Sequence, residues 1–139
     1  SQRPYLPLGT LARAVAYPLT AQGPREEMER ALRLVGMEAF LARLDEVADW
    51  SHILSLGEQQ RIAFARVLLV RPAWAFLDEA TSALDEAREK ELYEMLAREL
   101  PEMGVVSVGH RSTLRGQHGR ELHLSGAGGF TTHVLAAST

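Results

Sequence analysis

Two neighbouring carboxylates, Asp78 and Glu79, directly follow a short apolar run at residues 73–77. Such a run is typical of a strand buried on both faces of a parallel sheet, and the carboxyl ends of parallel strands border the ligand crevice of α/β folds. Adjacent ionised carboxylates repel each other, and Mg²⁺ is the natural cation to offset that repulsion. The alternative is an acidic turn whose carboxylates are simply solvated. His110 directly follows a second strand-like segment, residues 104–109, so we expect it at the same edge of the sheet as Glu79.

A polar turn at residues 54–61 runs directly into an apolar helical pattern at residues 62–70. Ser55 and Glu58 stand three residues apart before that pattern, which is the spacing of a capping box. The turn therefore offers free backbone N–H groups, a hydroxyl and the positive end of a helix dipole at one place, and a phosphate group could bind there. The alternative is an ordinary helix cap that stabilises the helix by about 1 kcal/mol.

The remaining pattern predicts an α/β fold that positions these two groups of residues. The other predicted helices lie at residues 11–16, 25–35, 38–44 and 87–100. The predicted strands lie at residues 73–77, 104–109, 120–125 and 130–135. We expect the first three helices to form a small subdomain that presents the polar turn, the last helix to connect the first two strands as a right-handed βαβ unit, and the last two strands to form a closing hairpin. The chain is accordingly divided into residues 1–71 and residues 72–139.

The composition excludes several classes of protein. With 139 residues, 46% apolar and 24% charged, the chain has the size and composition of one globular domain. Its formal charge of −3 gives no general attraction to nucleic acid or to anionic lipid, and the absence of cysteine excludes disulfides and thiolate chemistry. The longest apolar stretch, residues 62–70, is interrupted by Arg66 and is far shorter than the ~20 residues that span a bilayer.

Four segments resemble motifs of the ATP-binding cassette (ABC) family, in that family's order. Residues 2–10, QRPYLPLGT, resemble the Q-loop, with wording most similar to half-transporters of the peroxisomal acyl-CoA type and to bacterial relatives for peptide or cobalamin uptake. Residues 54–61, LSLGEQQR, resemble the LSGGQ signature, with Leu56 in place of its first glycine and Glu58 in place of its glutamine. Residues 77–85, LDEATSALD, resemble the Walker B motif followed by the D-loop, and residues 108–111, VGHR, resemble the H-switch.

The resemblance implies a partial P-loop NTPase fold, with ATP and Mg²⁺ as its ligands. It implies that Asp78 and Gln2 contact Mg²⁺, that Glu79 polarises the water attacking the γ-phosphate, and that His110 hydrogen-bonds this phosphate. The residues that it assigns to nucleotide binding are Gln2, Ser55, Leu56, Gly57, Glu58 and Asp85. In this scheme the signature closes on ATP held by a second subunit, and Asp85 helps to join the two nucleotide sites.

The Walker A sequence of the family, Gly-x-x-x-x-Gly-Lys-Ser/Thr, does not occur in these 139 residues. We therefore expect the chain to be the C-terminal part of a longer nucleotide-binding domain, inactive by itself, with exposed apolar surface and a tendency to self-associate. The resemblance implies a homodimeric partner domain, a transmembrane domain in the same polypeptide, and a place on the cytoplasmic face of a membrane, the inner membrane in a bacterium. Nucleic acid is not an expected partner. Two alternatives stay open: an ABC-type ATPase of DNA repair or chromosome structure, and a non-enzymatic interaction module.

Overall fold

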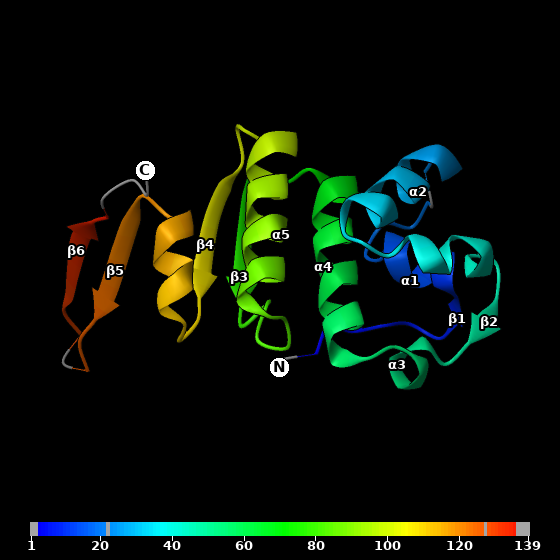
Figure 1. Ribbon diagram of the computed structural model, residues 1–139, viewed down its shortest axis with the longest axis horizontal. Coiled ribbons are helices and arrows are strands. Elements are labelled where there is room, and N and C mark those ends of the chain that lie inside the picture. Colours follow the sequence, from blue (N-terminus) through cyan, green and yellow to red (C-terminus); the bar gives the residue numbers. More distant parts are fainter. Residues whose placement is uncertain (1–2, 22, 127, 136–139) are drawn as a thin grey trace.

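The structure is a computed structural model, and it describes residues 3–21, 23–126 and 128–135. Its elements follow one another along the long axis of the molecule (Figure 1), from a helical cluster at one end to a hairpin at the other. The helices are α1 (Leu11–Ala16), α2 (Arg25–Leu34), η1 (Glu38–Arg43), α3 (Trp50–Ile53), α4 (Leu56–Val70), α5 (Glu86–Glu99) and η2 (Ser112–Gln117). The strands are β1 (Gly9–Thr10), β2 (Val47–Ala48), β3 (Trp74–Asp78), β4 (Gly104–Val108), β5 (Arg120–Leu124) and β6 (Phe130–Val134).

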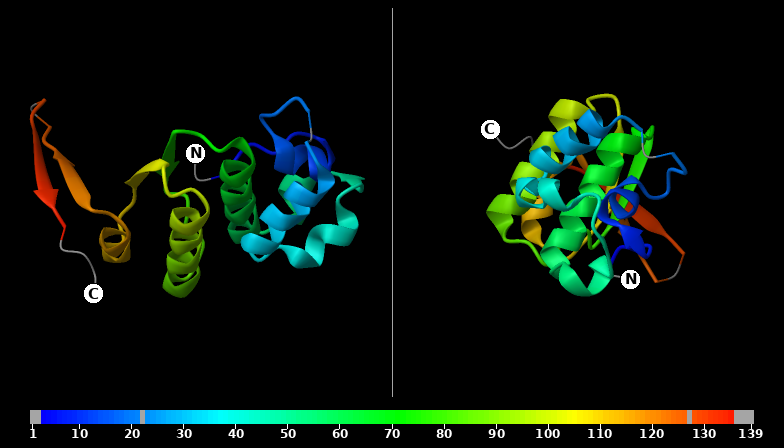
Figure 2. Two further views of the ribbon diagram at one scale, coloured as in Figure 1. Left: turned by 90° about the horizontal axis from the view of Figure 1, so that it is seen from above. Right: turned by 90° about the vertical axis from the view of Figure 1, so that its right-hand side faces the viewer.

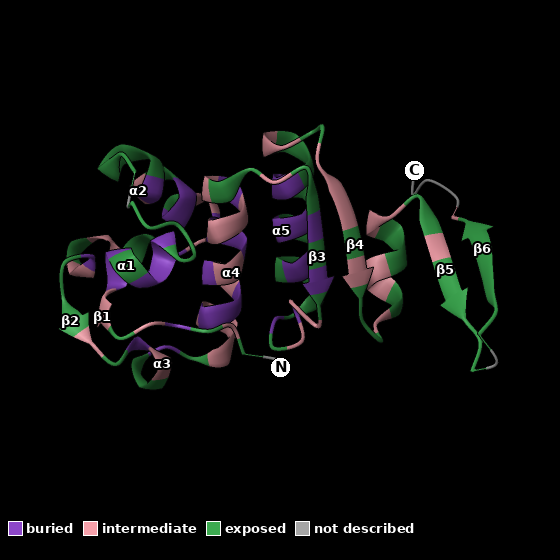
Figure 3. Cartoon of the chain, turned by 180° about the vertical axis from the view of Figure 1, so that it is seen from behind, coloured by how far each residue is buried: buried purple, intermediate pink, exposed green. Residues whose placement is uncertain are grey.

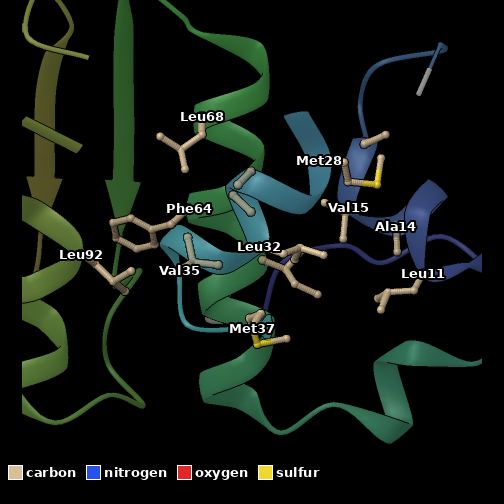
Figure 4. Packing of buried hydrophobic residues seen from close by; sticks show 14 of the residues in the cluster. Leu11, Ala14, Val15, Met28, Leu32, Val35, Met37, Phe64, Leu68 and Leu92 are labelled. Carbon is tan, nitrogen blue, oxygen red and sulfur yellow. The ribbon is translucent and has the colours of Figure 1, made fainter. Parts of the chain in front are cut away.

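Helices α1 and α2 pack against α4 and bury the apolar positions that the sequence pattern places on one face of each helix. Figure 4 shows Val15 of α1 and Met28 and Leu32 of α2 on one side of α4, whereas Phe64 of α4 points to the other side, toward Leu92 of α5. Thr10 caps α1, because its Oγ1 accepts the Arg13 N–H at 3.1 Å. The helical subdomain predicted from the sequence therefore surrounds the buried side of α4.

Two details of this half go beyond the sequence prediction. The short helix predicted at residues 38–44 is a 3₁₀ helix, η1, with bonds such as Phe40 N–H to the Met37 carbonyl at 3.0 Å. Strands β1 and β2, which pair antiparallel with Thr10 opposite Val47, were not predicted. Elements this short carry too few residues for a periodic pattern, so local packing decides their form.

The predicted βαβ unit is confirmed. Strands β3 and β4 pair in parallel, α5 connects them, and the register places Asp78 opposite Val108. On the covered face, Tyr93 of α5 meets Phe64 of α4 edge-to-face, with ring centroids 5.9 Å apart. The two strands end at the same edge of the molecule as the N-termini of α4 and α5 (Figure 1).

Only one face of this two-stranded sheet is covered. Ala75 and Leu77 are buried, whereas Trp74 and Phe76 are 62% and 76% exposed. Helices α4 and α5 both lie on the covered side, and the burial colours alternate along β3 (Figure 3). The expectation that this strand is buried on both faces is therefore wrong for the described structure, because no described element lies on the second face. The expectation of exposed apolar surface is confirmed.

The closing hairpin is also confirmed. β5 and β6 pair antiparallel from Arg120 opposite Val134 to Leu124 opposite Phe130, and the Ser125 N–H donates to the Gly129 carbonyl at 2.9 Å. The hairpin extends away from the helices (Figure 2), and every residue of β6 is exposed. Within the described residues, no helix has both the length and the apolar character to cross a lipid bilayer.

Contacts cross the predicted boundary at residue 71, so the division of the chain into residues 1–71 and 72–139 stays a prediction. Arg71 ends α4 in a left-handed conformation, with φ 49°. Beyond it, Glu99 of α5 pairs with Arg30 of α2 at 2.5 Å, and this contact lowers the pKa of the Glu99 carboxyl. The two parts of the chain are thus joined by packing and by charge.

Candidate functional site

Glu79 and His110 meet at the edge where β3 and β4 end. The Glu79 N–H donates to the Val108 carbonyl at 2.9 Å, which extends the parallel pairing one residue beyond β3. Glu79 then turns into the left-handed region at φ 49°, a conformation that costs free energy in a residue with a Cβ. His110 Nε2 lies 3.2 Å from Glu79 Oε1. The prediction that these two side chains share one edge is confirmed.

The two members of the pair differ in their surroundings. The Glu79 side chain is 24% exposed, whereas that of His110 is 92% exposed. Glu79 is therefore largely enclosed by its surroundings, whereas the His110 side chain projects into solvent and contacts Glu79. The pair can orient a water molecule and place a ring N–H or lone pair beside it, which is the geometry of a proton-accepting and hydrogen-bonding site.

Asp78 directly precedes Glu79 in the chain, but it lies on the uncovered face of the sheet. It is the last residue of β3, it is exposed, and it shares the uncovered face of the sheet with Trp74 and Phe76. Among residues 3–21, 23–126 and 128–135, no group of three or more His, Asp or Glu side chains is arranged to hold a metal ion. A single carboxylate nevertheless fits Mg²⁺, because this ion is usually bound through one or two carboxylates with the remaining positions taken by water and substrate phosphates.

The polar turn forms the capping box that the sequence predicts. Ser55 Oγ accepts the Glu58 N–H at 3.2 Å, and Glu58 Oε2 accepts the Ser55 N–H at 2.8 Å. In the described part of the chain, the N–H groups of Leu56 and Gly57 donate to no hydrogen-bond partner, as is usual in a first helical turn. One expectation needs correction: residues 56–61 are not a separate turn, because α4 already begins at Leu56.

Gly57 lies where α4 approaches the loop at residues 80–85. A Cβ at this position would lie 3.2 Å from Leu84 Cδ2 and 3.5 Å from the Ala83 carbonyl oxygen. A glycine therefore allows the first turn of α4 to pack closely on the loop that follows Glu79. The sequence motif does not reveal this contact within one chain, because it joins residues about 27 positions apart, a separation that only the tertiary fold closes.

Gln60 is a site-supporting residue that the sequence analysis did not single out. Its side chain is 1% exposed, its Nε2 donates to the Glu79 carbonyl at 3.3 Å and to Ser82 Oγ at 2.9 Å, and its Oε1 accepts the Ala83 N–H at 3.0 Å. One amide thus ties α4 to the backbone on both sides of the loop. A signal existed: Gln60 precedes Phe64 by four residues, so a polar side chain occupies the buried stripe of α4.

The sequence motifs and this geometry agree with the comparison to known proteins. The family model described as ABC transporter matches residues 8–82. The chain belongs to the ABC transporter family.

The relatives of this ABC transporter chain are longer proteins. An uncharacterized ABC transporter ATP-binding protein of Haemophilus influenzae is 46% identical over 129 residues, which cover 92% of this chain and 22% of that protein. The lysosomal cobalamin transporter of Homo sapiens is 42% identical over 138 residues, which cover 91% of this chain and 22% of that protein. The chain therefore spans about a fifth of the length of these relatives.

A solved structure supports the fold. A bacterial Atm1-family ABC exporter with ATP bound matches 88% of this chain and 22% of its own, at 28% identity and a TM-score of 0.75. The α/β fold predicted as part of an ABC ATPase is thereby confirmed, together with the family resemblance.

Two of the residues that the resemblance assigns to nucleotide binding, Asp85 and Gln2, are not part of the arrangement described above for this ABC transporter chain. Asp85 is the N-cap of α5, where its Oδ1 accepts the Arg88 N–H at 2.7 Å, so a structural role accounts for its position. Its role in joining two nucleotide sites stays a prediction. Gln2, assigned to the Q-loop, lies outside the described residues.

Proposed function

We propose that this chain is part of the ATP-hydrolysing domain of an ABC half-transporter, in which ATP-driven dimerisation and hydrolysis move a substrate across a membrane. The observation that carries the proposal is the Glu79–His110 pair, 3.2 Å apart at the carboxyl edge of parallel strands. Family membership, the capping box at Ser55 and the neighbouring carboxylate of Asp78 support it. By themselves the 139 residues are proposed to hydrolyse no ATP, because they contain no lysine-bearing phosphate loop.

The proposed mechanism assigns a role to each residue at this edge. Glu79 accepts a hydrogen bond from the attacking water and aligns it with the γ-phosphate. His110 hydrogen-bonds the γ-phosphate and, through its contact with Glu79, keeps the carboxylate in place. Asp78 would hold Mg²⁺, which offsets the negative charge of the phosphates when bound. Such positioning and charge stabilisation supply most of the rate enhancement in phosphoryl transfer.

The first turn of α4 is proposed to complete the site of a second nucleotide-binding domain. The N–H groups of Leu56 and Gly57, the Ser55 hydroxyl and the helix dipole favour an anionic group at this place. Glu58 accepts the Ser55 N–H in the capping box, so its proposed contribution is to hold Ser55 rather than to bind phosphate directly. A homodimer would place two such turns against two sets of Asp78, Glu79 and His110.

A transmembrane domain is proposed as the second partner, on the cytoplasmic face of a membrane. Its proposed contact is the surface around α1, β1 and β2, where Tyr5, Leu8 and Val47 are strongly exposed. Exposed apolar side chains of this size favour a protein contact. The net charge of −3 argues against nucleic acid as a partner.

The test uses the intact transporter that carries this sequence. Replacing Glu79 by Gln removes the proton acceptor but keeps the shape of the side chain, so we expect ATP turnover to fall by about 10²-fold or more while bound ATP is retained and the dimer is stabilised. Phosphate release, nucleotide retention and sedimentation measure the three effects. His123→Gln, a change in the exposed hairpin, is the control. Unchanged turnover in Glu79→Gln would remove the proposed role of Glu79.

A further inference from the structure

The buried carboxylate of Glu89, in the first turn of α5, has no role in the mechanism described above. Glu89 is 1% exposed, and burying a carboxylate is costly unless its oxygens are satisfied. Here Oε2 accepts the Thr81 hydroxyl at 2.5 Å and Oε1 accepts the Thr113 hydroxyl at 2.7 Å, while Arg111 Nη1 lies 3.8 Å from Oε2. The two hydroxyl groups that donate to Glu89 thus come from different segments of the chain.

The two segments joined by Glu89 are those that flank the candidate catalytic pair. Thr81 belongs to the loop at residues 80–85, which begins after Glu79 and ends at Asp85. Arg111 directly follows His110, and Thr113 lies three residues after it. Arg111 adds a second connection, because its guanidinium donates to the carbonyls of Leu84 at 2.5 Å and Ser82 at 3.0 Å.

The exposure of His110 makes this connection necessary. Because the His110 side chain is 92% exposed, little packing fixes it, and its position depends on its backbone. A cavity of about 220 Å³ lies beside the pair and is lined by Glu79, Thr81, Glu89 and His110, among others, so side chains do not fill this space either. The contacts of Arg111 and Thr113 therefore hold the segment after His110 against the loop, while the bond from the Glu79 N–H to the Val108 carbonyl holds the strand before it.

We propose that Glu89 is a positioning residue, which keeps the segment after His110 and the loop at residues 80–85 in one arrangement, so that His110 stays aligned with Glu79. A displacement of the loop that carries Asp85 is then transmitted to His110 through Glu89 and Arg111. This inference rests on the proposed function, since it concerns the alignment of the proposed catalytic pair.

The experiment compares variants of the intact transporter in ATP hydrolysis. Thr113→Val removes one hydroxyl at constant shape, and Thr113→Ser restores it. We expect Thr113→Val to lower kcat by about 10- to 100-fold with KM for ATP within twofold, because a misplaced hydrogen-bonding group slows the chemical step without weakening binding. Thr113→Ser should return kcat to near the wild-type value. Thr131→Val, in the exposed strand β6, is the matched control and should leave kcat unchanged.

Glu89→Gln tests the acceptor itself. Because Glu89 and Thr113 act through one hydrogen bond, the double variant Glu89→Gln/Thr113→Val should lose little more activity than the more impaired single variant. If Glu89→Gln does not fold, Arg111→Lys, which keeps the charge but loses the paired contacts to Ser82 and Leu84, replaces it and should show the same fall in kcat at constant KM.

The outcomes separate this inference from the proposed function. If Glu79→Gln abolishes turnover but Thr113→Val keeps the wild-type kcat, Glu89 does not position His110 and the inference is overturned. A parallel rise in KM and fall in thermal stability, without rescue by Thr113→Ser, would also overturn it in favour of a merely structural role. If Glu79→Gln leaves turnover unchanged, the proposed function has failed.

Discussion

Gln60 is the residue whose environment most directly connects helix packing to the candidate site. All three hydrogen bonds of its side chain reach residues beyond α4, at Glu79, Ser82 and Ala83. Its neighbour Gln59 is almost equally buried, but Gln59 Nε2 donates to the carbonyls of Ser51 and Leu54, in the segment before α4. The two adjacent glutamines therefore form a natural comparison: one holds the loop beside Glu79 and the other holds the segment before α4.

We expect Gln60→Leu to lower the free energy of unfolding by about 1–3 kcal/mol, because it removes the hydrogen bonds that the buried Gln60 amide makes to Glu79, Ser82 and Ala83. The variant should also release the loop, so amide hydrogen exchange at Ala83 should accelerate relative to the wild type. Denaturant titration and hydrogen exchange measure the two effects.

The control for this change is Gln59→Leu, which removes hydrogen bonds of similar burial but none to the loop. It should lower stability without a selective increase of exchange at Ala83. Equal exchange at Ala83 in both variants would mean that the loop is held by packing alone.

At the scale of the element, α4 connects both groups of predicted site residues. Its first turn carries the capping box, its buried stripe carries Gln60 and Phe64, and its C-terminus leads into β3. Arg66 on the same helix donates to the carbonyls of Tyr5 and Ala14, and burial lowers the pKa of its guanidinium to about 10, so it remains charged at neutral pH. The helix thus links the segment before α1 to the strands of the sheet.

We expect Ser55→Ala to lower the free energy of unfolding by about 1 kcal/mol, since it removes the acceptor for the Glu58 N–H at the start of α4. Glu58→Gln should stay within about 0.5 kcal/mol of the wild type, because a glutamine amide oxygen can also accept the Ser55 N–H. Urea titration of both variants gives the comparison. A Ser55→Ala variant as stable as the wild type would show that the cap hydrogen bond adds nothing in this context.

At the scale of the whole molecule, the most conspicuous feature is the uncovered face of the β3–β4 sheet. Phe76, Val106 and Val108 are exposed there, and Trp74 lies across Gly104, whose added Cβ would fall 2.3 Å from the indole ring. Contiguous apolar surface of this kind favours association. The exposed hairpin at the end of the molecule adds a further unpaired strand edge.

We therefore expect the 139-residue chain to self-associate in a concentration-dependent way. Phe76→Lys should shift the equilibrium toward monomer, because it places a charge in the middle of the uncovered face. Sedimentation velocity over a dilution series measures this. Ile53→Lys, at an exposed apolar position of the helical half, is the control and should shift it less. A wild-type chain that stays monomeric throughout the series would contradict the prediction.

The sequence alone predicted the features that depend on local order along the chain. The capping box at Ser55 and Glu58, the βαβ unit and the closing hairpin follow from spacing and periodicity, and the register of a parallel pair then brings Glu79 and His110 to one edge. The family resemblance added the chemistry expected of these residues, and their roles stay predictions.

Only the tertiary structure decided which distant segments touch and which surfaces stay open. The contacts of Gln60 and Glu89 with the loop after Glu79, and the close approach of Gly57 to Leu84, join residues on separate elements, so no local pattern contains them. The exposure of Phe76 could likewise not be predicted from the apolar pattern of β3. An apolar run indicates that a strand can be buried on both faces, whereas its actual burial depends on which elements pack against it.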